Sequence, residues 1–186
     1  MSDETRPAPA RRLVDPPWRD ALARALDVAE RSVAAFYAIQ PREWASRFRY
    51  DLASAADHPA LTFAPGTMAQ IVALEIADSS RPPRWRIVLR DPVVLRLARR
   101  HGLDNVLAYA LSHELVHLVR FASGLAAFEE TRVGHRDDEE RKVSRIAAEA
   151  LAPSLGPAAR PALDALSGGA APPAQRSRRG TGANPV

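Results

Sequence analysis

A single apolar stretch, residues 103–121 (LDNVLAYALSHELVHLVRF), constrains the fold of this chain more than any other feature. From residue 106 to residue 119 it contains no glycine or proline, and its only carboxylate is Glu114, within the segment that begins at His113 and ends at His117. This composition is typical of a buried helix. An ionised carboxylate in such a helix costs several kcal/mol unless it is paired or bound to a metal. The stretch therefore predicts a buried helix whose polar side chains have a specific partner.

The two histidines are four residues apart, which places both on one face of a helix with about 3.6 residues per turn. At this spacing, both imidazoles can reach one metal ion. Glu114 lies about 100° further round the helix, close to where a water on the metal would sit, and this position predicts a general base. The alternative is a packing helix on which His113, Glu114 and His117 are each satisfied by local hydrogen bonds.

The sequence HELVH at residues 113–117, with its uncharged flanks, resembles the active-site helix of the HExxH zinc metallopeptidases, the zincins. The metzincin branch does not fit, because it has glycine and histidine where this chain has Arg120 and Ser123. A gluzincin-like arrangement remains, in which a glutamate from a second helix completes the site. The resemblance implies a single α+β domain, dominated by helices, with a small antiparallel or mixed sheet beside the HExxH helix.

A second helix is predicted over residues 137–153, where an acidic start precedes a clear apolar face. On a helical wheel both Glu139 and Glu140 lie at the edges of that face, so spacing alone leaves two candidates for the third metal ligand. His135, in the preceding loop, is a further candidate. The alternative is that the two glutamates are solvated residues that favour the helix dipole.

The same segment is similar to the second motif of the ImmA/IrrE-type metallopeptidases, in which a glutamate precedes a stretch resembling FAAELLMP. Here the stretch is IAAEALAP at residues 146–153, and the motif carried over residue by residue puts the ligand at Glu140. Val143 and Ser144 stand where that family usually has alanine and asparagine. The resemblance therefore implies a Zn²⁺ ion held by the two histidines and this glutamate.

The 186 residues, 46% hydrophobic and 26% charged, suit one globular domain with tails. Composition predicts a flexible arm at residues 1–17, the zincin-like metallopeptidase domain at residues 18–166 and a disordered tail at residues 167–186. The chain has no cysteine, so a zinc site must use histidines and carboxylates. It has neither an apolar signal core near residue 1 nor a run long enough to span a membrane, which favours a cytoplasmic location.

The net charge of +4 raises the question of a nucleic-acid partner. Only Lys142 is a lysine, and the arginines are scattered among acidic residues except in the terminal segments. Nucleic acid is therefore not the favoured partner, although the arginine-rich terminal segments keep it as an option. The sequence does not indicate an oligomeric state.

Apolar periodicity predicts an amphipathic helix over residues 18–39, and residues 47–52 favour a short strand over a helix. A turn-rich segment separates two further predicted strands, residues 69–77 and 84–90. These two strands should form a hairpin with one apolar face and one basic face.

Asp91 and Pro92 indicate a helix start, with Asp91 as the N-cap, and Gly102 indicates the end of that helix. Asp104 or Asn105 is expected to cap the helix that carries the histidines. A further weak helix is expected between residues 155 and 166.

The residues and the resemblance together predict a zinc-dependent peptidase that hydrolyses a peptide or protein substrate, with Glu114 as general base. One alternative is a catalytically inactive regulatory or scaffold protein with the same fold. Another is a DNA-associated protease similar to the SprT-like branch of HExxH proteins, which would bind DNA with a steep salt dependence.

Overall fold

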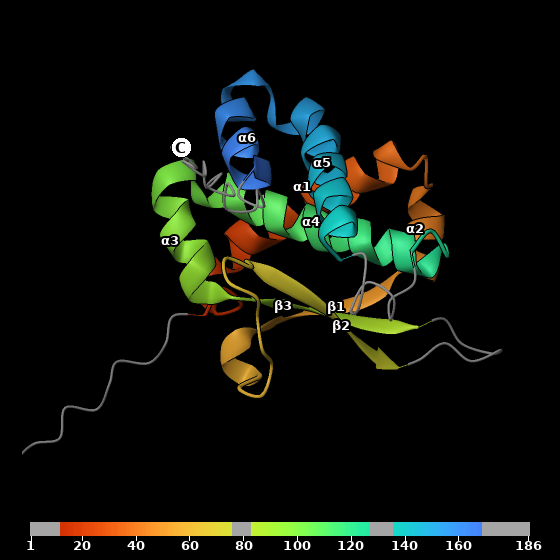
Figure 1. Ribbon diagram of the computed structural model, residues 1–186, viewed down its shortest axis with the longest axis horizontal. Coiled ribbons are helices and arrows are strands. Elements are labelled where there is room, and N and C mark those ends of the chain that lie inside the picture. The colour runs from red at the N-terminus through yellow and green to blue at the C-terminus, as the bar shows by residue number, and fades with distance from the viewer. Residues whose placement is uncertain (1–11, 76–82, 127–135, 169–186) are drawn as a thin grey trace, which may run out of the picture.

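Helices cover one face of a small sheet in the computed structural model, which describes residues 12–75, 83–126 and 136–168 (Figure 1). The architecture is a single α+β domain dominated by helices, with a three-stranded mixed sheet, as the sequence predicts. Within the described residues, no helix is both long enough and apolar enough to cross a membrane.

The described elements are six α-helices, two 3-10 helices and three strands. In chain order they are α1 (Pro16–Phe36), α2 (Pro41–Arg47), β1 (Arg49–Ser54), the 3-10 helix η1 (Ala55–Asp57), β2 (Ala69–Glu75), β3 (Arg84–Leu89), α3 (Asp91–His101), α4 (Leu103–Ala122), α5 (Arg136–Leu155), the 3-10 helix η3 (Pro157–Ala159) and α6 (Arg160–Gly168).

The sheet has the strand order β1-β3-β2. β2 and β3 pair antiparallel, which confirms the predicted hairpin, and β1 pairs with β3 in parallel. The parallel pairing was not predicted, because it joins segments that are far apart in the sequence. Apolar side chains such as those of Trp85 and Ile87 are buried, whereas Arg84 and Arg86 lie in alternate positions along β3. The strand therefore has the predicted apolar face, whereas the opposite face is basic at Arg84 and Arg86 and carries the fully buried Val88.

α4 is the central helix, and it lies between the sheet on one side and α5 and α6 on the other (Figure 1). It packs along α1 and also contacts α3, α5, α6 and β2. Nearly every residue from Val106 to Arg120 is buried, and only His113 in that range is partly exposed. An apolar sequence without glycine or proline over this range gives a helix that can be buried on all sides. The polar side chains between Val106 and Arg120 are consequently enclosed by the surrounding elements, with only His113 partly exposed.

The N-terminal boundary differs from the prediction. Leu13 is fully buried, and its backbone N–H donates a 2.6 Å hydrogen bond to Oδ1 of Asp91. The predicted arm at residues 1–17 is therefore wrong for residues 12–17, which are part of the packed domain, while residues 1–11 lie outside the described residues. At the other end α6 reaches Gly168, and the rest of the predicted tail lies outside the described residues.

Two predicted helix caps are also wrong. Arg90 is the N-cap of α3, and the Asp91 carboxylate instead accepts hydrogen bonds from the N–H of Leu13 and from the Ser54 hydroxyl at 2.6 Å each. A buried carboxylate needs such donors, and here two distant segments supply them. The N-cap of α4 is Gly102, with a φ of +79° that favours glycine, and neither Asp104 nor Asn105 caps the helix.

Candidate metal centre

Two imidazoles and one carboxylate from different helices meet at one point. His113 and His117 lie one turn apart on α4, with ring centroids 5.0 Å from each other. Nε2 of His113 is 3.1 Å from Oε2 of Glu140, and Nε2 of His117 is 3.5 Å from Oε1 of the same residue. Glu140 belongs to the first turns of α5. The structure thus brings together the three residues that the sequence and the resemblance select as metal ligands.

The spacing of the three donor atoms suits a small metal ion. All three lie within 4.8 Å of one another. Zinc binds histidine nitrogen and carboxylate oxygen at about 2.0–2.2 Å in a tetrahedral arrangement, which places neighbouring donors about 3.3–3.5 Å apart. The two nitrogen–oxygen separations of 3.1 and 3.5 Å, each to a different oxygen of Glu140, are close to that value. Two imidazoles and a carboxylate form a donor set that zinc and neighbouring first-row metals accept.

The environment of Glu140 favours its ionised form. Burial alone would raise the pKa of this carboxyl, but hydrogen bonds to His113 and His117, together with their charges, lower the pKa well below its usual range. The Glu140 side chain is 37% exposed, whereas the His117 side chain is 7% exposed. The cluster is therefore closed on the α4 side and open to solvent on the α5 side, and its carboxylate is ready to bind a cation.

Glu114 lies beside this cluster but does not belong to it. Its side chain is buried, and Oε2 accepts a 2.9 Å hydrogen bond from the backbone N–H of Ile71 in β2. The pKa of Glu114 is raised to about 7, mainly because the carboxyl is buried. The nearby His113 opposes this rise, and the charge of Glu140 adds to it. At neutral pH this carboxyl can therefore either accept or release a proton, as a general base or acid requires.

Glu139, the other candidate for the third ligand, has a different partner. Its carboxylate forms a two-pronged ion pair with the Arg120 guanidinium of α4, in which Nη2 is 2.8 Å from Oε2 and Nε contacts Oε1. The structure therefore places Glu140 at the histidines and Glu139 away from them. His135 lies outside the described residues.

Aromatic stacking holds the His117 ring. Tyr109, His113, His117 and Phe121 follow one another at four-residue intervals along α4. The rings of His117 and Phe121 stack with centroids 5.4 Å apart, and Phe121 stacks in turn on Trp85 of β3 at 5.9 Å. Nδ1 of His117 is buried without a hydrogen-bond partner among the described residues, so the ring is held by stacking and by the contact of Nε2 with Glu140.

Sequence reasoning missed two groups at this site, Arg120 and the stacked rings. The positions of Arg120 and Phe121 relative to His117 could have indicated both groups. Arg120 lies three residues after His117, and Phe121 lies four residues after it, so both are on the adjacent turn of the same helix. Their partners, on α5 and β3, are distant in the sequence and could not be assigned from it.

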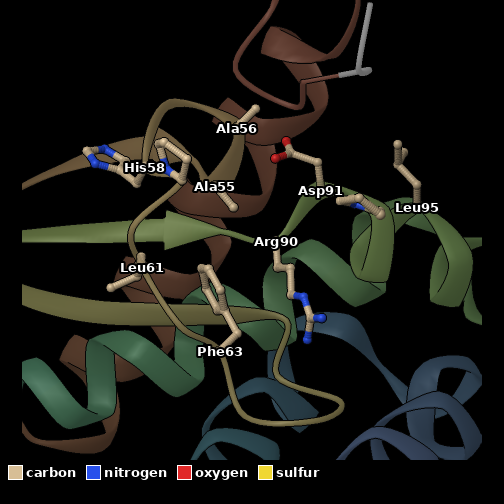
Figure 2. Close-up of a pocket in the computed structure, with 10 residues that line it drawn as sticks. Ala55, Ala56, His58, Leu61, Phe63, Arg90, Asp91 and Leu95 are labelled. Atoms are coloured by element: carbon tan, nitrogen blue, oxygen red, sulfur yellow. The ribbon is translucent and has the colours of Figure 1, made fainter. Parts of the chain in front are cut away.

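A separate pocket lies elsewhere on the domain. It has a volume of about 520 Å³ and is lined by the segment from Ala55 to Phe63 and by the start of α3, including Arg90 and Asp91 (Figure 2). The walls are mainly apolar, and the Arg90 guanidinium lies over the Phe63 ring at 5.6 Å. None of the three candidate ligands, His113, His117 and Glu140, lines this pocket.

Comparison of this chain with known proteins identified no relative. No protein-family model, no curated protein and no solved structure matches this chain. The chemistry of the site is therefore inferred from its own residues.

Proposed function

We propose that this protein is a zinc-dependent peptidase that hydrolyses peptide bonds. His113, His117 and Glu140 would hold the Zn²⁺ ion, and Glu114 would act as the general base. The observation that carries the proposal is the convergence of the three donor atoms within 4.8 Å of one another, where the interior of α4 meets the first turns of α5. The resemblance of HELVH to the zincin active-site helix supports the same assignment.

The number of protein donors supports catalysis over a structural role. Structural zinc sites have four protein ligands, whereas catalytic sites have three and leave one position for water or substrate. Bound zinc would supply Lewis acidity, which lowers the pKa of water and polarises a carbonyl group. In the described residues the donor group contains three members, and the Glu140 side chain is open to solvent.

Glu114 supplies the proton transfers that amide hydrolysis needs. Its carboxyl would take a proton from the attacking water and give it to the leaving amine, so that no covalent bond to the protein forms. The pKa of about 7 suits both transfers at neutral pH. A regulatory or scaffold protein would not need a buried carboxyl beside its metal ligands, so we favour the peptidase over the inactive alternative.

The proposal is tested by metal analysis together with hydrolysis of an unfolded protein substrate. Purified protein should contain close to one zinc per chain, should cleave the substrate, and should lose activity with a chelator and regain it with Zn²⁺. The His117→Ala variant should lose both zinc and activity, while the matched His101→Ala variant, altered at the end of α3, should keep both.

Three results would overturn the proposal or redirect it. A wild-type protein that binds no zinc overturns it outright. Stoichiometric zinc without hydrolysis of any peptide or protein substrate replaces it with the regulatory or scaffold alternative. Hydrolysis that requires DNA, with DNA binding that weakens steeply as salt rises, replaces it with the DNA-associated protease.

A further inference from the structure

Three polar residues of α4 form one stripe that faces α5. His113, His117 and Arg120 are separated by four and then three residues, so they lie on one side of the helix. The first two meet Glu140, and the third meets Glu139. Two consecutive glutamates of α5 therefore contact all three positions of the same stripe.

The contact between Arg120 and Glu139 is enclosed and directional. The Arg120 side chain is 5% exposed and the Glu139 side chain is 11% exposed. Two parallel N–H groups of the guanidinium meet the two carboxylate oxygens, a geometry that fixes orientation as well as distance. The hydrogen bonds to Glu139 raise the pKa of Arg120, which keeps the guanidinium charged. Arg120 also donates a 3.4 Å hydrogen bond to the Leu125 carbonyl.

This ion pair lies at the end of a helix, where backbone hydrogen bonds alone give little order. α5 begins at Arg136, so Glu139 and Glu140 are in its first turns. The first N–H groups of a helix lack partners within the helix, and helix ends open more readily than helix centres. A contact that anchors Glu139 to α4 therefore also sets the position and the rotation of the next residue, Glu140.

We propose that Arg120 is a positioning residue for the metal ligand Glu140, and that it acts by holding Glu139. The inference rests on the proposed function, because Glu140 needs a fixed position only if it binds a metal. Arg120 also decides which of two adjacent glutamates reaches the histidines, since the glutamate bound to the guanidinium cannot turn toward them. Glu140 is then the only one of the pair left to complete the cluster.

An ion pair in the same turn provides a matched comparison. Arg141 contacts Asp138 on the exposed side of α5, with side chains that are 55% and 72% exposed. Both pairs involve one arginine and one acidic residue of the first turns of α5, but only the buried pair joins α5 to α4. Removing the exposed pair should therefore leave the position of Glu140 unchanged.

The experiment measures the Zn²⁺ affinity of the full chain by competition with a chelator. Arg120→Gln should weaken Zn²⁺ binding by about 10- to 100-fold, the usual effect of losing a group that orients a metal ligand. Arg120→Lys should recover part of the loss, because lysine restores the charge but not the two-pronged geometry. Arg141→Gln should stay within about twofold of the wild type.

A second readout separates positioning from general stability. In metal-free protein, amide hydrogen exchange at residues 138–143 should be faster in Arg120→Gln than in Arg141→Gln, while amides in the centre of α4 exchange as in the wild type. Should Arg120→Gln fail to fold, Glu139→Gln replaces it in both measurements, because this substitution keeps the buried volume and removes the charge that Arg120 binds. Zn²⁺ affinity within twofold of the wild type in a folded Arg120→Gln or Glu139→Gln variant would overturn the inference.

The two proposals fail in different ways. In one outcome the wild type binds Zn²⁺ and the Arg120 variants bind it weakly, while no substrate is cleaved. That result supports the positioning role of Arg120 and contradicts the peptidase function. If the wild type cleaves its substrate and the variants bind Zn²⁺ normally, the peptidase stands and positioning does not. A wild type that binds no Zn²⁺ overturns both.

Discussion

Oε2 of Glu114 accepts a 2.9 Å hydrogen bond from the backbone N–H of Ile71, and this contact joins the helix that carries the histidines to β2. Ile71 lies opposite Ile87 in the antiparallel ladder, so its main chain is fixed by the sheet. A backbone donor cannot rotate away as a side chain can. The contact therefore holds the Glu114 carboxyl in one orientation beside the metal cluster.

Replacing Glu114 with glutamine should separate metal binding from turnover. Glutamine keeps an oxygen that can accept the Ile71 N–H, so the fold and the zinc content should remain those of the wild type. The variant cannot take up a proton, and hydrolysis should fall by about 100- to 10,000-fold, the usual contribution of a general base. Zinc content and initial rates, with the exposed Glu149→Gln as control, test this. Unchanged rates would refute the role of Glu114.

Zinc should stabilise the fold because the ligands come from two helices, α4 and α5. At a free Zn²⁺ concentration about 100 times the dissociation constant, the gain in the free energy of unfolding is about 2.7 kcal/mol. For a domain of this size it should raise the melting temperature by about 5–11 °C. Thermal unfolding with Zn²⁺ or with a chelator measures the shift. Glu140→Gln should reduce it strongly, and an equal shift in that variant would exclude Glu140 as a ligand.

Asp91→Ala should destabilise the domain by about 2–4 kcal/mol. The substitution leaves the buried N–H of Leu13 without its acceptor and removes the acceptor of the Ser54 hydroxyl. Urea denaturation measures the loss. The control is Asp104→Ala, which removes an exposed carboxylate 3.6 Å from Arg24 and should change stability by less than about 0.5 kcal/mol. Equal losses in the two variants would contradict the bridging role of Asp91.

The ion pair between Asp51 and Arg86 should make stability depend on pH in the acid range. Hydrogen bonds from Arg86 lower the pKa of Asp51, against a smaller opposing effect of burial. Because the folded pKa is below the unfolded value of about 3.9, the contribution is fully present above that value and is lost as the pH falls. Chemical denaturation should show a larger difference between wild type and Asp51→Asn at pH 7 than at pH 3. A difference that grows on acidification would reverse the sign and contradict the pairing.

Local sequence patterns predicted the structural features that depend only on residues close together in the chain. The spacing of His113 and His117 places both rings on one face of any helix, and the alternation along residues 84–90 yields a strand with two distinct faces. The helix and the hairpin followed from the same periodicities. These features needed no knowledge of the rest of the fold.

Contacts between distant segments could not be predicted in the same way. On a helical wheel Glu139 and Glu140 are equivalent; the motif resemblance favoured Glu140, and the physical contact that separates the two is the one between Glu139 and Arg120 on the facing helix. Asp91 before Pro92 has the local pattern of a helix cap, yet Leu13 and Ser54 supply its partners. In each case the decisive partner lies more than fifteen residues away, as the sequence separations of 19, 78 and 37 show.

His113 precedes Glu140 by 27 residues. During synthesis on the ribosome, both imidazoles therefore emerge well before the carboxylate does. A nascent chain that ends ahead of α5 offers only two donors, too few for a stable zinc site. On the proposed assignment, metal loading would follow translation of Glu140, and a shorter polypeptide would not hold the proposed hydrolytic centre.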